Sequence, residues 1–184
     1  MTDAHIRLRP ARIHEHQRLS DIARAAKAHW GYPPEWLALW RDELTITPAQ
    51  IQAGEVICAE LDGELAGVIV LEPAAPVDDA TVAADASAAE AEPLPEAEPV
   101  PEPVPVPVPE IDGLWVLPSA MGRGVGSALL RDLGDRLRRA GHTRLRIVAD
   151  PHAAPFYERH GARRAGLVPS RPAGRSLPLY YLAL

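Results

Sequence analysis

Three glycines alternate between positions 122 and 126, directly after an apolar strand and directly before an amphipathic helix. Glycine lets the backbone come close to a ligand, and the free N–H groups of a helix's first turn point toward the loop in front of it. Such a turn is suited to phosphate oxygens, and Arg123 adds a fixed positive charge. The expected contacts are Gly122, Arg123, Gly124, Val125, Gly126 and Ser127.

A second group of polar side chains lies downstream of a further strand. It contains Asp150-Pro151-His152, followed by Phe156-Tyr157-Glu158-Arg159-His160-Gly161. Upstream of the glycine loop, Glu110 and Asp112 share one parity on their strand, so both can face the same side of a sheet. Carboxylates and a tyrosine hydroxyl are groups that can accept and donate protons in catalysis.

The elements that must position these residues follow from hydrophobic periodicity. The expected strands are 6–10, 56–61, 64–71, 110–117, 143–149, 162–168 and 176–184. Helices are expected at 15–28 and 125–140, and a short helix is expected to end at His160. A further helix is opened by Pro33-Pro34 and has one apolar face, formed by Trp36, Leu37, Trp40 and Leu44. Asp62-Gly63 is typical of a hairpin turn, and Thr47-Pro48 of a helix start. This order predicts an α/β fold with a mixed sheet and helices on its faces.

Residues 74–109 interrupt this order between the third and fourth strands. Ten prolines lie between Pro73 and Pro109, in a stretch made mostly of Ala, Glu and Val. Such a sequence favours extended polyproline conformations over helix or sheet. We therefore predict a disordered or semi-rigid insertion within a single domain that spans 1–184, since this length is ordinary for one domain.

The two motifs and the element order together resemble the GNAT superfamily of acyl-coenzyme A N-acyltransferases. Met121–Gly126 lies on that family's Arg/Gln-x-x-Gly-x-Gly/Ala loop, and Phe156–Gly161 lies on its Phe-Tyr-x-x-x-Gly motif. Three further segments also look like a bacterial branch of this superfamily: His29–Pro33, Asp150-Pro151 and Gly174–Leu179. The resemblance covers nearly the whole chain apart from the insertion. It implies a mostly antiparallel sheet of about seven strands, about four helices, and a splayed cofactor gap between two parallel strands.

The activity implied by the resemblance is transfer of an acetyl group from acetyl-coenzyme A to a primary amine of a small molecule or protein. The amine attacks directly, without an acyl-enzyme and without a metal. Tyr157 falls on the family's general-acid tyrosine, which protonates the departing thiolate. Direct attack also needs a base for the ammonium proton, and Glu110 and Asp112 are the candidates.

The resemblance also implies which residues bind the two substrates. The strand before the glycine loop is expected to pair with the pantetheine arm through its backbone, and the second motif adds side-chain contacts. These cofactor-binding residues are Trp115, Val116, Leu117, His152 and Phe156. Trp30 and Tyr32 lie between the first two helices, where GNAT proteins commonly bind the acceptor.

Composition and charge narrow the alternatives. No apolar run approaches the roughly 20 residues that span a bilayer, and the first ten residues lack a signal-peptide core, so we predict a cytoplasmic protein without a membrane partner. The single cysteine, Cys58, excludes an intrachain disulfide, and no spacing supports a metal site. Residues 123–184 hold 12 Arg against four acids in a chain of net charge −6. This balance disfavours nucleic acid as a partner and suits a small polyanionic ligand. The scarcity of basic residues in the N-terminal half makes an acidic acceptor less favoured.

Several residues also have a plain structural interpretation. Tyr157 can be a packing residue, Glu110 and Asp112 a solvated strand edge, and Trp30 and Tyr32 core aromatics. A rival function is a non-catalytic module that binds coenzyme A as a sensor or scaffold and uses the acidic Pro-rich insertion as its working part. The absence of the family's Arg or Gln at position 121 supports this rival. A homodimer is compatible with either function.

Overall fold

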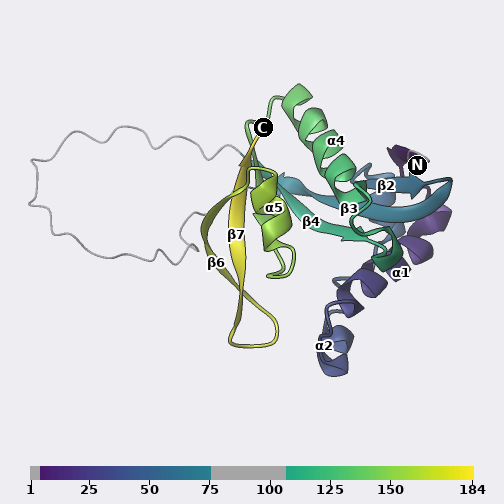
Figure 1. The fold of residues 1–184 in the computed structure, drawn as a ribbon. Coiled ribbons are helices and arrows are strands. Elements are labelled where there is room, and N and C mark those ends of the chain that lie inside the picture. The colour runs from purple at the N-terminus through teal and green to yellow at the C-terminus, as the bar shows by residue number, and fades with distance from the viewer. Residues whose placement is uncertain (1–4, 76–106) are drawn as a thin grey trace, which may run out of the picture.

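The computed structural model describes residues 5–75 and 107–184, which form one seven-stranded sheet in the order β1-β2-β3-β4-β5-β7-β6 (Figure 1). The strands are β1 Ile6–Pro10, β2 Val56–Leu61, β3 Glu64–Ala75, β4 Val108–Val116, β5 Arg144–Val148, β6 Arg163–Ser170 and β7 Arg175–Ala183. The α-helices are α1 His16–Ala28, α2 Pro34–Leu39, α3 Pro48–Gln52, α4 Val125–Arg139 and α5 Ala154–Arg159. Paired strands are antiparallel except β4 and β5, which are parallel. The predicted fold class, a mixed and mostly antiparallel sheet with flanking helices, is confirmed.

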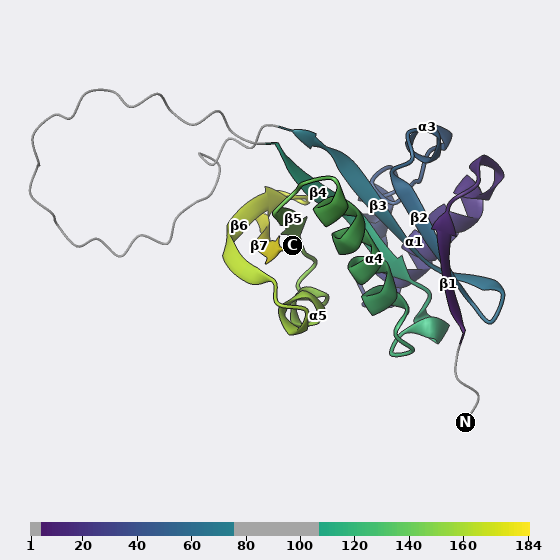
Figure 2. The same ribbon diagram turned by 90° about the horizontal axis from the view of Figure 1, so that it is seen from above.

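Helices cover both faces of the sheet (Figure 2). On one face, Leu129 of α4 belongs to the same buried cluster as Ile57 of β2. On the opposite face, Leu19 of α1 belongs to a second cluster with Val56 of β2. Successive residues of a strand point to opposite faces, so the continuous apolar run of β2 contributes to both cores.

The helix opened by Pro33-Pro34 is shorter than predicted. α2 ends at Leu39, and Trp40 is its C-cap. Trp40 and Leu44 are nevertheless buried, and they cluster with Ala23 of α1. The indole Nε1 of Trp40 donates a hydrogen bond of 3.1 Å to the carbonyl oxygen of Arg171. The apolar face was therefore predicted correctly, but its last residues lie in a turn that packs against α1.

Two predictions of local structure are confirmed. Thr47 caps α3: its Oγ1 accepts from the backbone N–H of Gln50 at 3.2 Å, and the Gln50 side chain accepts from the backbone N–H of Thr47 at 2.9 Å. This reciprocal capping makes α3 a separate helix, so the described residues contain five α-helices where about four were expected. Asp62 and Gly63 have φ of 54° and 90°, as a tight hairpin turn requires.

The third and fourth strands are longer than predicted. β3 continues to Ala75, and β4 begins at Val108, which is the partner of Ala75 in the sheet. Proline is tolerated near the ends of strands, which is where Pro109 lies. The two ends of the predicted insertion 74–109 therefore belong to the sheet, and the rest of it, 76–106, lies outside the described residues.

The parallel strands β4 and β5 separate soon after they meet. Their paired positions are Glu110 with Arg146 and Ile111 with Ile147. On its other edge, β4 shifts register against β3, and Asp112 is the extra residue of this irregularity. A bulge bends its strand and increases the local twist. The irregularity at Asp112 thus coincides with the point where β4 and β5 diverge.

The close approach of α4 to β3 depends on Gly67. A Cβ atom at this position would lie 2.8 Å from Cγ1 of Val125 and 3.1 Å from the carbonyl oxygen of Trp115. We expect Gly67→Ala to lower the free energy of unfolding by about 1–3 kcal/mol, measured in urea. Gly134→Ala is the matched control, because the new Cβ is 3.6 Å from its nearest neighbour and alanine favours the helix. Equal stability of Gly67→Ala and wild type would contradict this packing.

Candidate active site

The glycine loop has the backbone conformation that its sequence predicts. Gly122 and Gly124 have φ of 76° and 86°, values that side chains with a Cβ rarely adopt. Gly124 is the N-cap of α4, a helix of 15 residues. A Cβ on Gly126 would lie 3.4 Å from the ring of Phe156. The loop and the first turn of α4 therefore bring the predicted cofactor-binding residues 122–127 together, with Phe156 of α5 beside them.

Two polar side chains of this loop already have partners. Arg123 forms an exposed ion pair of 2.8 Å with Asp62 in the β2–β3 hairpin. Ser127 Oγ lies 3.0 Å from Nε2 of His160, whose Nδ1 lies 2.8 Å from the carbonyl oxygen of Phe156. Because a carbonyl only accepts, the neutral ring carries its hydrogen on Nδ1, and Nε2 accepts from Ser127. The side chains of Arg123 and Ser127 are thus both engaged within the protein, and the contact of Ser127 with His160 is one that the sequence did not identify.

Tyr157 is buried at the centre of α5. Its side chain is 5% exposed and belongs to the core on the α4 face. Burial raises the pKa of Tyr157, and the negative charge of Asp150 raises it further. The hydroxyl therefore stays protonated at neutral pH. It can donate a proton, which is the role that the resemblance implies, and its burial equally fits the packing interpretation.

The two candidate bases have different environments, although both lie on the α1 face of β4. Glu110 pairs with Arg146 on β5, and burial raises its pKa against the opposing effect of that arginine. Asp112 accepts a hydrogen bond of 3.3 Å from Nε2 of Gln50. Desolvation, together with the negative charges of Glu72 and Glu110, raises the pKa of Asp112 to about 6. Asp112 has no cationic partner among the described residues and is the better placed base.

The strand segment 113–116 has one edge available beyond the last β4–β5 pair. Its other edge pairs with β3, where Trp115 is opposite Val68. A Cβ on Gly113 would lie 1.8 Å from the Trp115 ring, so the indole lies directly over Gly113. The backbone N–H of Leu117 already donates to the carbonyl oxygen of Ala66 at 2.8 Å. Of the predicted pantetheine contacts, the backbone of residues 115 and 116 is thus better placed than that of residue 117.

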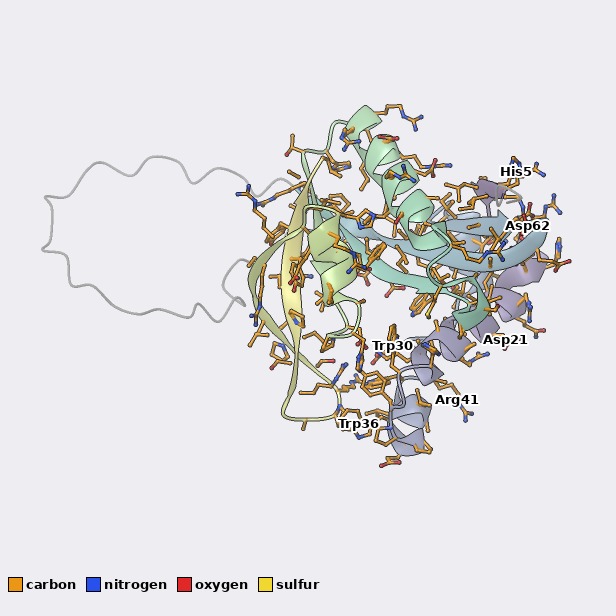
Figure 3. The ribbon with its side chains drawn as sticks, viewed as in Figure 1. His5, Asp21, Trp30, Trp36, Arg41 and Asp62 are labelled. Atoms are coloured by element: carbon orange, nitrogen blue, oxygen red, sulfur yellow. The ribbon has the colours of Figure 1, made fainter. Side chains whose placement is uncertain are left out.

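The predicted acceptor residues, Trp30 and Tyr32, lie between α1 and α2, near the β6–β7 hairpin. Figure 3 shows Trp30, together with Trp36 of α2, in this part of the molecule. The Trp30 ring stacks on His152, with ring centroids 5.0 Å apart and parallel planes. The Tyr32 hydroxyl donates to the carboxylate of Asp150 at 2.9 Å. His152, which is predicted to contact the pantetheine, therefore lies beside the predicted acceptor residue Trp30.

The structure adds a partly buried ionic cluster that the sequence did not predict as a unit. Lys27 of α1 pairs with Asp150, and its Nζ lies 4.5 Å from the centre of the Trp40 ring. Arg175 lies 3.5 Å from the same carboxylate. Burial lowers the pKa of Lys27. Burial also acts to raise the pKa of Asp150, but the hydrogen bond from Lys27 keeps the Asp150 pKa below its ordinary value. The only available signals were that Lys27 is the sole lysine and that Asp150 and Arg175 lie in segments typical of one bacterial branch.

Residues 5–75 and 107–184 offer neither a clustered metal site nor a membrane-spanning helix. This part of the chain contains no group of three or more His, Cys, Asp or Glu side chains that could hold a metal ion. It also contains no helix that is long and apolar enough to cross a membrane.

Several solved structures have a fold similar to that of this chain. The PaiA N-acetyltransferase from Thermoplasma acidophilum, in complex with coenzyme A, is 15% identical, with a TM-score of 0.66 and coverage of 98% of this chain and 99% of that chain. A GCN5-related N-acetyltransferase from Rhodopseudomonas palustris is 20% identical, with a TM-score of 0.68 and coverage of 100% and 99%. A GNAT acetyltransferase from Brucella melitensis, in complex with acetyl-coenzyme A, is 20% identical, with a TM-score of 0.57 and coverage of 94% and 95%. The fold is that of an N-acetyltransferase.

The sequence itself identifies the family. Residues 17–162 match the model of the acetyltransferase (GNAT) family. No curated protein sequence matches the chain. The chain belongs to the GNAT acetyltransferase family.

Proposed function

We propose that the protein transfers an acetyl group from acetyl-coenzyme A to a primary amine by direct attack. One observation carries this proposal: β4 and β5 separate at Asp112, beside the glycine-capped start of α4. Coenzyme A fits these residues, because Gly122 leaves open space at the loop and the β4 edge offers backbone groups to an extended arm. When bound, acetyl-coenzyme A supplies the activated acyl group.

Each step then has a residue suited to it. Residues 122–127 hold the pyrophosphate through backbone N–H groups, and the β4 edge orients the thioester. Asp112, with a pKa of about 6, is ionised at neutral pH and takes the proton that the amine nitrogen loses when it attacks the thioester, directly or through water. Tyr157, which stays protonated, gives its proton to the departing thiolate. The acceptor amine enters from the α1 face, beside Trp30 and Tyr32.

Turnover is the decisive test. Purified protein is incubated with acetyl-coenzyme A and a panel of primary amines that includes small molecules and peptides with free N-termini. Release of the thiol is followed together with the mass of the product. An acetylated amine supports the proposal. Binding of coenzyme A without turnover of any amine would favour the sensor or scaffold instead.

A substitution at the helix start tests the cofactor site separately. Gly124 has φ of 86°, and a β-branched residue there strains the backbone by about 1–3 kcal/mol. We expect Gly124→Val to weaken coenzyme A binding at least about tenfold by calorimetry, because it displaces the first turn of α4. Gly141→Val is the matched control: its φ is 88°, but it follows the far end of α4. Unchanged affinity in folded Gly124→Val would contradict the loop assignment.

A further inference from the structure

The ionic cluster on the α1 face joins three distant parts of the chain around two aromatic rings. Lys27 comes from α1, Asp150 follows β5, and Arg175 begins β7. The guanidinium of Arg175 lies 4.9 Å from the centre of the Trp40 ring and 5.6 Å from that of Tyr32. The three charged side chains are only 12–15% exposed. Charges withdrawn from water to this extent need strong partners.

The Asp150 carboxylate has close hydrogen-bond partners, whereas the polar contacts of the Arg175 guanidinium are long. The Asp150 carboxylate accepts from Lys27, from the Tyr32 hydroxyl at 2.9 Å and from the backbone N–H of His152 at 3.0 Å. Arg175 lies 3.5 Å from Asp150, and its hydrogen bonds to Tyr32 and to Ser170 Oγ are 3.4 and 3.2 Å. A charge-assisted hydrogen bond is normally about 2.7–2.9 Å. The guanidinium is desolvated and only loosely held.

The charges of the cluster do not balance. Two cations share the single carboxylate of Asp150. Glu43, after α2, adds a weaker negative field at Lys27. A guanidinium with five N–H donors in a fixed fork matches a carboxylate in geometry as well as in charge. The group that would complete this cluster is therefore a small carboxylate.

The position of the cluster relates this carboxylate to the reaction. Asp150 follows the end of β5, and Asp112 lies on β4. One member of the cluster and the candidate base are therefore positioned by the two strands that separate. We propose that the acceptor is a small amino-carboxylic acid whose carboxylate binds Arg175 and whose amine points toward Asp112. This rests on the proposed function, of which it specifies the substrate class.

This inference reverses one expectation from the sequence. The scarcity of basic residues in the N-terminal half made an acidic acceptor less favoured. The structure brings Lys27 from that half together with Arg175 from the basic C-terminal part, so the positive charge at the site comes from both.

The test compares acceptors that differ only in the carboxylate. The pairs are β-alanine with ethylamine, γ-aminobutyrate with propylamine, and phenylalanine with phenethylamine. For wild type we expect kcat/KM to be at least about tenfold higher for the carboxylate member of at least one pair. Arg175→Gln should abolish this preference, because KM for the carboxylate member should rise at least about tenfold more than KM for the plain amine. Arg171→Gln, an exposed arginine of the same hairpin, is the control and should keep the preference.

Two kinds of result would overturn the inference. One is equal or better turnover of the plain amine in every pair with wild type. The other is an equal loss of kcat/KM for both members of each pair in Arg175→Gln. Arg175→Lys keeps the positive charge and shows whether misfolding alone accounts for such a loss. If nothing is acetylated, calorimetry on the coenzyme A complex decides. Arg175-dependent binding of the carboxylates then supports this site although the proposed transfer has failed, and absence of binding refutes the inference.

Discussion

Replacement of Tyr157 by Phe is expected to lower kcat for acetyl transfer about 100-fold or more and to leave the Kd of coenzyme A nearly unchanged. The thiolate leaves quickly only if a proton reaches the sulfur as the C–S bond breaks. Burial and Asp150 both raise the pKa of Tyr157, so its hydroxyl holds a proton to give. Phe keeps the ring that packs on Phe156, with centroids 5.1 Å apart, and removes only the donor.

The measurement separates chemistry from binding. Steady-state kinetics give kcat and KM for acetyl-coenzyme A and the best amine, and calorimetry gives the Kd of coenzyme A. Tyr181→Phe is the control, because Tyr181 lies on β7 and its ring packs against Arg144, 5.1 Å away. Its kcat should match that of wild type. An unchanged kcat in Tyr157→Phe would leave this tyrosine only its packing role.

The parts of the fold that depend on neighbouring residues could be predicted from the sequence. The turn at Asp62-Gly63 and the cap at Thr47 each involve residues at most three apart. The glycine loop is similar, because the positive φ of Gly122 and Gly124 is a property of those residues. Amphipathic spacing likewise predicted the apolar face that includes Trp40. These features follow from local chain geometry.

The parts that depend on distant residues could not be predicted. Lys27 and Asp150 are 123 positions apart, and no local pattern pairs them. Equally, nothing in the sequence separates Glu110 from Asp112 as a base. The difference arises because Glu110 faces Arg146 across the parallel pair. The register shift at Asp112 is also a property of the assembled sheet, since β4 pairs with β3 across the insertion.

Arg123 has a position that could be predicted from the sequence and a partner that could not. Its position in the loop was predicted, and so was a contact with phosphate. In the structure its guanidinium pairs with Asp62 across an exposed 2.8 Å contact. An exposed pair of this kind contributes little to stability, because water and salt screen the attraction between its charges. Exchange of Asp62 for a phosphate therefore faces only a small barrier, and the ion pair does not conflict with a role in binding.

Replacement of Asp112 by Asn is expected to lower kcat/KM by about 100-fold at pH 7.5 and to remove the acid limb of the pH profile. In wild type that limb should lie at pH about 6, with activity rising as the pH increases, because the base form is the ionised carboxylate. Glu72→Gln provides a more specific test of the Asp112 pKa. It removes a negative charge that raises the pKa of Asp112, so the acid limb should move to lower pH while the plateau stays.

The stability of the Asp112 variant separates catalysis from folding. The folded-state pKa of about 6 lies above the ordinary 3.8, so the fold favours the neutral form, and stability from this group is lost as pH rises through that interval. At pH 7.5 the ionised side chain therefore destabilises wild type, and Asp112→Asn should unfold at no lower temperature. A variant that melts normally yet keeps full kcat/KM would exclude Asp112 as the base, and the same kinetics on Glu110→Gln would then test the remaining carboxylate.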